Sequence, residues 1–391
     1  MASVPKILLV LFEGLPGTVI ESQVLLHARE MSRLGIASFE IWAFACSEAL
    51  YRSSHAMQAH AEGLAGCRVR VLRGVRPVVP FSAHINARLL RRALRHARPE
   101  FDMIHARTDY TARICGILRR AGAFTLLWDC RGDAVAELLD RTAGDSPFTR
   151  LAGAIRARLL RRDRALAARL CDRGVFVTRV LKALAQPEFG VKPAWVIPGT
   201  APSDLFHFDL GLRERIRAQL GFMPHETVYV FSGSLAPYQC FDEMLEMFSV
   251  ISAQDPQARL LLLTPAVKAA EARLAKLGLD AMVRHAGISD VNGYLNAADI
   301  AFMLRSHSAT NRAAFPTKFS EYCLAGLPVI MTDAVPDAYR VAAELGNHVA
   351  PPHAGQISLP ASYNRQEVAR RACQSLTRES VAPLYAEAYR G

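Results

Sequence analysis

The sequence predicts an α/β protein built from two doubly wound parallel sheets. Short apolar runs that match buried parallel strands alternate with amphipathic helical stretches along most of the chain. This alternation ends near residue 198 and restarts near residue 228, which indicates two units of similar build. With 391 residues, 51% of them hydrophobic and 21% charged, the chain is long enough for two ordered domains.

The first half opens with a strand, a glycine loop and a helix. Residues 6–12 are a continuous apolar run, as expected of a strand buried on both faces. The loop at residues 13–17 contains Gly14 and Gly17, and an amphipathic helix is expected over residues 22–34. Further strands are expected at residues 39–44, 69–72, 103–105, 125–128, 174–178 and 195–197, with a basic helix at residues 89–98.

The second half repeats this pattern after a Pro-, Gly- and Ser-containing linker at residues 198–208. Strands are expected at residues 228–232, 259–263, 283–285, 300–304 and 328–332, with helices at 242–251, 268–277 and 291–297. The sequence thus predicts domains at residues 1–198 and 199–364. Residues 365–391 are expected to form closing helices that pack back toward the first domain.

The net charge of +11 is unevenly distributed. Residues 1–198 contain 30 basic and 17 acidic residues, whereas residues 199–391 contain 17 and 19. Arginine runs at residues 88–98 and 156–173 form either a solvated helix face or a surface for an acidic partner. The runs lack interleaved aromatic residues, so nucleic acid fits them less well than anionic lipid headgroups.

Cysteine usage and hydropathy indicate the compartment. The eight cysteines are scattered without a CxxC pair or histidine cluster, which argues against a zinc site or a disulfide framework. No apolar run is long enough for a signal peptide or membrane span. We expect a cytoplasmic protein without a metal or cofactor, with peripheral contact at the inner membrane face as an option.

Residues 315–330 are the most informative stretch for function. Pro316 is suited to a helix start and Gly326 to its end, so Thr317 and Lys318 fall in the first turn, where free backbone N–H groups favour an anion. Glu321 lies about one turn further on and shares their face. This offset suits a nucleoside diphosphate whose ribose meets the carboxylate. The alternative is an ordinary helix start, since these residues are common there.

Two other nucleotide motifs are not matched. Gly14 and Gly17 form only a GxxG, without the full GxGxxG fingerprint or its acidic ribose partner, which disfavours a nicotinamide cofactor. The phosphate-binding pattern GxxxxGK[ST] does not occur in the sequence.

Four segments, taken in order, resemble the glycosyltransferases of the GT-B type, family 4. They are Val196-Ile-Pro198 with Asp204-Leu-Phe206, Val228-Tyr-Val-Phe-Ser-Gly-Ser-Leu235, Tyr294-Leu-Asn-Ala-Ala-Asp-Ile300 and Phe319-Ser-Glu-Tyr-Cys-Leu-Ala-Gly-Leu-Pro-Val-Ile330. The resemblance covers nearly the whole chain. It implies two Rossmann-like domains facing across a cleft, with the nucleotide sugar on the second and the acceptor on the first.

The resemblance also implies an activity and site roles. It implies a transferase of the hexosyl or a related type, acting with retention in polysaccharide biosynthesis on a glycan or lipid-linked acceptor. Glu321 would contact the donor ribose, and the Gly14 to Gly17 loop would close on the donor. Gly233 and Ser234, after the first strand of the second domain, are further expected donor contacts, with Pro316 and Thr317.

The chain departs from the family pattern at charged positions. The first of two glutamates spaced eight apart would fall on Ala313, and a basic pair would fall on Ser234 and Gln239. A diphosphate leaving group needs stabilisation of its charge. Lys318, with Arg305 or Arg312, is therefore the expected replacement.

The first domain carries candidate residues with two readings each. Where the family often has a histidine, this chain has Asp129-Cys-Arg131; these either line the acceptor side as catalytic residues or Asp129 caps a loop. His105 either faces the cleft or is a structural histidine, and Glu13 either serves the site or is a helix-entry charge.

Two functions from different classes follow. The first is glycosyl transfer from a nucleoside-diphosphate sugar. The second is a catalytically silent scaffold of a polysaccharide-assembly complex, suggested by the missing charges. A sugar-nucleotide epimerase of the same architecture matches the motifs less well.

Overall fold

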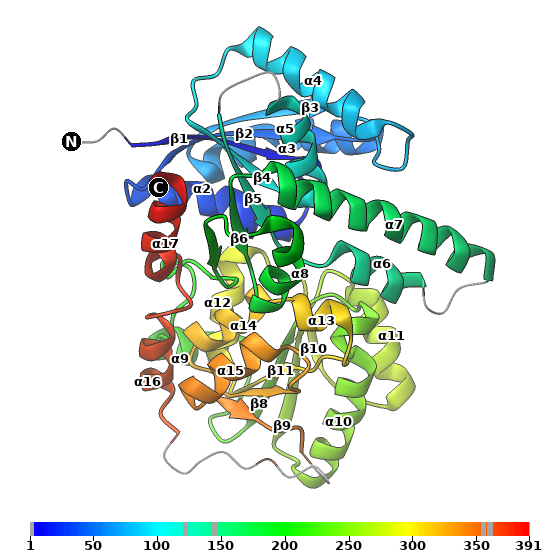
Figure 1. Cartoon of the computed structure of the whole chain (residues 1–391). Helices are drawn as coiled ribbons and strands as arrows, with labels where there is room; N and C mark the ends of the chain where they lie inside the picture. Colours follow the sequence, from blue (N-terminus) through cyan, green and yellow to red (C-terminus); the bar gives the residue numbers. More distant parts are fainter. Residues whose placement is uncertain (1–3, 120–123, 143–146, 353–356, 358–362, 391) are drawn as a thin grey trace. The chain divides into compact units, whose positions relative to one another are not determined.

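The computed structural model describes residues 4–119, 124–142, 147–352, 357 and 363–390. The chain divides into two compact units (Figure 1). The first unit contains Met1–Pro198 and Val381–Gly391, and the second contains Gly199–Ser380. Each unit is built around its own parallel sheet.

The first unit has a seven-stranded sheet in the order β3-β2-β1-β4-β5-β6-β7, with every neighbouring pair parallel. Its strands are β1 (Lys6–Leu11), β2 (Ser38–Ala45), β3 (Arg68–Arg73), β4 (Met103–Arg107), β5 (Thr125–Cys130), β6 (Arg173–Phe176) and β7 (Ala194–Val196). Because the strand order reverses at β1, the carboxyl ends of β1 and β4 form the switch point at which open α/β sheets bind ligands.

The helices of the first unit connect these strands (Figure 1). They are α1 (Thr18–Ile20), a π-helical turn (Glu21–Leu25), α2 (Leu26–Arg33), α3 (Glu48–Ala65), α4 (Ser82–Ala97), α5 (Asp109–Arg119), α6 (Ala134–Thr142), α7 (Pro147–Leu170) and α8 (Arg179–Phe189). The last helix of the chain, α17 (Arg378–Arg390), adds Val381, Tyr385 and Tyr389 to the core beside β1 and α2.

Some helix boundaries in the first unit differ from the prediction. The helix after β1 begins at Thr18 because Gly17, with φ 121°, serves as its N-cap. Helix α4 begins at Ser82, several residues before the predicted start. Helix α3 was not predicted because its buried residues, Ser54, Ala61 and Ala65, are small and give little hydrophobic periodicity.

The second unit has a six-stranded sheet in the order β10-β9-β8-β11-β12-β13. Its strands are β8 (Thr227–Ser232), β9 (Ala258–Leu263), β10 (Met282–Arg284), β11 (Ile300–Met303), β12 (Val329–Met331) and β13 (His348–Val349). Its helices are α9 (Leu210–Leu220), α10 (Phe241–Gln254), α11 (Val267–Leu277), α12 (Ile288–Ala297), α13 (Ala309–Ala313), α14 (Thr317–Leu324), α15 (Pro336–Leu345) and α16 (Arg365–Ala372). Here the switch point lies between β8 and β11.

Two parallel, doubly wound sheets confirm the predicted α/β fold class. The segment predicted as a linker is packed within the second unit from residue 199 on. There the Ala201 N–H donates to the carbonyl of Leu376, and the Phe206 side chain is buried. Of the stretch predicted to form closing helices, residues up to Ser380 fall in the second unit and the rest in the first.

Candidate functional site

Helix α14 forms as the sequence predicts. Pro316 is its N-cap residue in an extended conformation (φ −66°, ψ 127°), and the helix runs over Thr317–Leu324. Gly326 follows with φ +68°, and a Cβ there would lie 2.2 Å from the carbonyl oxygen of Arg365. Only glycine fits this position, so the end of α14 is fixed by both conformation and packing.

Lys318 and Glu321 share one face of α14, as their spacing predicts. The Nζ of Lys318 lies 3.0 Å from the Oε2 of Glu321. The Glu321 side chain is 4% exposed and that of Lys318 is 33% exposed, so the carboxylate is held inside and the ammonium at the rim. Lys318 is thus paired with Glu321 in the structure, and its predicted role as the main cation for the diphosphate stays a prediction.

Arg305 is a more deeply buried cation beside α14. It follows β11, and the residue is only 8% exposed. Its Nη1 donates to the carbonyl of Leu304, 2.9 Å away, and no carboxylate of a described residue forms a salt bridge with it. Burial lowers the pKa of this guanidinium. A buried cation without a protein carboxylate is costly, and a bound anion would compensate it.

The backbone around Arg305 is fixed to the neighbouring strand end. The Arg305 N–H donates to the Oγ1 of Thr332 (3.3 Å), and that hydroxyl donates to the Arg305 carbonyl (2.7 Å). Thr332 directly follows β12, so the carboxyl ends of β11 and β12 are tied together. The backbone that carries the Arg305 guanidinium is therefore held in place by two hydrogen bonds.

A neutral pair occupies the positions where the resemblance expects two cations. The Gln239 amide donates to the Ser234 Oγ at 2.6 Å. A Cβ on Gly233 would lie 2.3 Å from the Gln239 Oε1, so the glycine makes room for this pair. The third departure, Ala313, is fully buried in α13. The structure therefore accommodates these three departures from the family pattern through local hydrogen bonding and packing.

Tyr322 is a site residue that sequence reasoning missed. The Ser232 N–H, at the end of β8, donates to its buried hydroxyl at 2.8 Å. The hydroxyl thus joins α14 to the strand that leads into Gly233 and Ser234. The available signal was its position next to Glu321, about 100° further round the helix, on a side that can face the sheet.

The second unit therefore gathers six predicted residues around one sheet edge. Gly233 and Ser234 follow β8, Arg305 follows β11, and Thr317, Lys318 and Glu321 lie on α14, which Tyr322 attaches to β8. β8 and β11 are parallel neighbours at the switch point, so their carboxyl ends meet. This edge is the candidate site.

The glycine loop of the first unit is fixed by packing. Gly14 has φ +71°, and a Cβ there would lie 2.8 Å from side-chain atoms of Leu50 and Ser54. The Leu15 N–H donates to the Ser54 Oγ, which holds the loop on α3. Gly17 has open space around it. A role of this loop toward a donor stays a prediction.

Asp129 and Arg131 belong to a buried network. Asp129 lies inside β5, so the loop-cap reading is wrong. Its carboxylate is 2.7 Å from the Nε of Arg131 and 3.2 Å from the Nε2 of His105. Burial raises the pKa of Asp129, but the Arg131 guanidinium and His105 outweigh it and hold that pKa well below its usual range.

This network holds the last helix of the chain. Arg131 donates to the hydroxyl of Tyr385 at 2.9 Å, and the Tyr389 hydroxyl lies 3.0 Å from His105 Nδ1 and 2.9 Å from His27 Nε2. The structure thus favours the structural reading of His105. A catalytic role of Asp129 and Arg131 stays a prediction.

Arg107 was also missed by sequence reasoning. Its Nε donates to the Oε2 of Glu13 at 2.9 Å, and its Nη1 donates to Gln23. Arg107 is the last residue of β4 and Glu13 follows β1, so this pair sits at the switch point of the first sheet. Glu13 is therefore paired with Arg107, and a role of Glu13 in a site stays a prediction.

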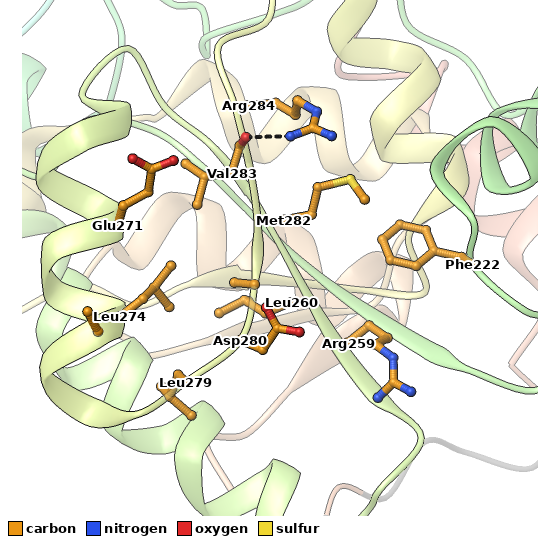
Figure 2. A pocket seen from close by; sticks show the side chains of 12 residues that line it. Phe222, Arg259, Leu260, Glu271, Leu274, Leu279, Asp280, Met282, Val283 and Arg284 are labelled. Carbon is orange, nitrogen blue, oxygen red and sulfur yellow. Dashed lines mark hydrogen bonds between the residues drawn. The ribbon is translucent and has the colours of Figure 1, made fainter.

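The second unit also has a hollow of about 550 Å³ at the β10 edge of its sheet (Figure 2). Figure 2 shows it beside β10 and α11, where Arg284 donates to the carbonyl of Val283. Its lining contains none of the predicted site residues. Among described residues, no group of three or more His, Cys, Asp or Glu side chains could hold a metal, and no helix is long and apolar enough to cross a membrane.

Comparisons with known proteins agree with this fold. Residues 213–358 match the family model described as glycosyl transferases group 1. No curated protein sequence matches the chain. The match lies within the second unit and includes Gly233, Arg305 and α14.

Solved structures resemble the chain over nearly its full length. A sucrose-phosphate synthase from Thermosynechococcus elongatus has a TM-score of 0.70 at 14% identity, covering 99% of this chain and 98% of that one. HepE from Anabaena in complex with UDP-glucose has 0.67 at 16%, covering 98% and 99%. WaaG, a glycosyltransferase involved in lipopolysaccharide biosynthesis, has 0.60 at 15%, covering 98% and 94%. The chain therefore has the GT-B fold, and residues 213–358 of its second unit match the model of group 1 glycosyl transferases.

Proposed function

We propose that the protein transfers a sugar from a nucleoside-diphosphate sugar to a glycan or lipid-linked acceptor, with retention of the anomeric configuration, in polysaccharide biosynthesis. The observation that carries the proposal is the buried Arg305 guanidinium without a carboxylate partner among described residues, at the switch point beside α14. The family match over residues 213–358 and the UDP-glucose bound to HepE support the same donor class.

Each residue of the candidate site has a role in this proposal. The N–H groups at the start of α14 and the Arg305 guanidinium bind the diphosphate. Glu321 accepts hydrogen bonds from the ribose hydroxyls, and Lys318 holds its carboxylate in place. Gly233 lets the backbone after β8 approach the donor closely.

The proposed reaction needs no protein nucleophile. The bond between the sugar C1 and the β-phosphate oxygen breaks, and a bond from an acceptor hydroxyl oxygen to C1 forms on the same face. The hydroxyl proton moves to the departing diphosphate. Arg305 stabilises the charge that grows on this leaving group, which is the kind of electrostatic contribution that dominates many enzymes.

We also propose that the protein acts in the cytoplasm. All eight cysteines are free, including the partly exposed Cys46 and Cys67 and the exposed Cys373. Free thiols are typical of a reducing compartment.

A panel of UDP-, GDP- and ADP-sugars tests the proposal. Each donor is scored by the shift it causes in the melting temperature and by slow release of free nucleoside diphosphate in chromatography. We expect one donor family to raise the melting temperature and to be hydrolysed, and Lys318→Ala to weaken both effects. A protein that no donor stabilises or that hydrolyses none would contradict the proposal.

The neutral Ser234–Gln239 pair and the buried Ala313 favour a second candidate, a binding protein without turnover. In that case the same panel would find a donor that raises the melting temperature without hydrolysis or transfer. Co-purification with other polysaccharide-assembly proteins would then support a scaffold.

A further inference from the structure

Three large apolar side chains of helix α7 lie on the outside of the first unit, whereas Leu160, Leu166 and Leu170 of the same helix are partly buried. Leu151, Ile155 and Leu159 are 63%, 59% and 49% exposed, and their spacing of four residues places them on one stripe. The inward face carries the small residues Gly153 and Ala157. An ordinary surface helix turns its large apolar residues toward the core, so three exposed ones on a single stripe are unusual. We call Leu151, Ile155 and Leu159 the α7 stripe.

Arginines surround the α7 stripe. Arg158 and Arg162 follow Ile155 by three and seven residues and lie on the same face, while Arg150, Arg156 and Arg161 flank it. All five are exposed, and none forms a salt bridge with a carboxylate of the described chain. The stripe is thus an apolar surface inside a field of unneutralised positive charge.

The C-terminal half of α7 and the face opposite the α7 stripe attach the helix to the rest of the first unit. Arg164 pairs with Asp133 and lies 3.5 Å from Asp109, and Asp163 pairs with Arg113 of α5. Ala157 packs on Val135 and Leu138 of α6. The α7 stripe contributes to none of these contacts, so its side chains can be changed without unfolding the first unit.

The helix is long enough to offer an extended surface. Its 24 residues span about 36 Å, and in Figure 1 its N-terminal half extends with α6 beyond the first sheet. Large exposed apolar residues beside positive charge are typical of helices that lie in the plane of a membrane interface. The arginine side chains can extend toward headgroups while their stems cover apolar surface.

We propose that α7 is a membrane-binding element that lies on an anionic lipid bilayer. The α7 stripe enters the boundary between headgroups and acyl chains, and the five arginines bind the acidic headgroups. The charge of the first half of the chain, 30 basic against 17 acidic residues, adds long-range attraction to such a surface. A lipid surface fits better than an apolar groove on another protein, because charge complementarity extends along the whole exposed face.

Vesicle binding tests this proposal without any donor, so its failure would leave the proposed transfer reaction standing. The full chain is sedimented with vesicles of phosphatidylcholine alone and with vesicles that contain phosphatidylglycerol. We expect binding only to the anionic vesicles, and weaker binding as salt rises. Equal partitioning to both, or to neither, overturns the proposal.

Two variants separate the apolar and the charged contributions. The triple variant Leu151→Ser, Ile155→Ser, Leu159→Ser should weaken binding to anionic vesicles at least about tenfold. Arg158→Gln, Arg161→Gln, Arg162→Gln should weaken it on the order of a hundredfold at low salt. Circular dichroism should show unchanged helix content in both.

Matched controls remove similar groups elsewhere. Arg88→Gln, Arg92→Gln, Arg95→Gln removes three charges from α4, and Leu210→Ser, Leu277→Ser removes two exposed leucines from the second unit. Both controls should retain most of the binding. If the α4 variant loses as much as the α7 variant, the assignment to α7 is wrong. If the α7 variants change the oligomeric state but not vesicle binding, the stripe binds protein instead.

Discussion

The Nζ of Lys318 lies 3.0 Å from the Oε2 of Glu321, one turn further along α14. Because this pair satisfies both charges, α14 offers a ligand its N–H groups and a fixed carboxylate, with little net charge. The positive charge for a diphosphate must then come from elsewhere. In the described part of the second unit, Arg305 is the buried cation that meets this need.

The pairing predicts how a change at Glu321 acts on binding. Glu321→Gln keeps the size of the side chain but removes the charged acceptor for the ribose and releases Lys318. We expect the affinity for a nucleoside diphosphate to fall about tenfold to a hundredfold, the usual effect of losing hydrogen bonds to a charged group. Titration calorimetry measures this change. An affinity within about twofold of that of the wild type would show that Glu321 does not bind the nucleotide.

The Asp129 network predicts a pH-dependent stability of the first unit. The folded pKa of Asp129 is depressed, so its stabilisation is present above the unfolded carboxyl pKa of about 3.9 and is lost as the pH falls through the lower folded value. Asp129→Asn leaves Arg131 buried and unpaired, which should cost about 3–5 kcal/mol at pH 7.

Urea unfolding measures this cost. Trp42, Trp128 and Trp195 all lie in the first unit, so tryptophan fluorescence reports on that unit alone. The difference between wild type and Asp129→Asn should shrink at strongly acidic pH. The exposed Asp140→Asn is the control and should have little effect. A cost below about 1 kcal/mol for Asp129→Asn would show that the network does not hold α17.

A substitution at Gly14 distinguishes a packing role of the glycine loop from a role in ligand binding. Gly14→Ala places a Cβ 2.8 Å from Leu50 and Ser54 on a backbone with φ +71°, so we expect the first unit to lose about 1–3 kcal/mol. Gly63→Ala, inside α3 with open space around it, should instead gain roughly 0.5–1 kcal/mol. Both are measured by the same fluorescence assay. A Gly14→Ala protein of unchanged stability but altered nucleotide affinity would assign the loop to the donor.

The fold was largely predictable because buried parallel strands leave continuous apolar runs such as residues 6–12. Helix α3 was not predicted, since its inward residues are small. The start of α4 was predicted too late in the sequence because the helix opens with the small residues Ser82 and Ala83. Of the two readings of Asp129, the loop cap was wrong because the strand extends to Cys130, and the contact of Asp129 with Arg131 could not be read from the sequence.

The candidate site was predictable to a different degree at each residue. The spacing of Lys318 and Glu321 follows from the helical repeat, so their shared face was foreseen. That the two form a pair, and that Arg305 has no carboxylate, depends on contacts between segments far apart in the sequence. Sequence reasoning missed Tyr322 and Arg107 for the same reason, because their partners, Ser232 and Glu13, lie far from them in the sequence.

The most direct test of the central claim compares two ligands on Arg305→Gln. The wild type should bind UDP or GDP far more tightly than the matching nucleoside, because only the diphosphate compensates the buried guanidinium. Arg305→Gln should weaken diphosphate binding about tenfold to a hundredfold and leave nucleoside binding unchanged, with no loss of melting temperature. Arg312→Gln, an exposed arginine on α13, should behave as the wild type. If Arg305→Gln binds the diphosphate as tightly as the wild type does, Arg305 does not hold the leaving group and the account is wrong.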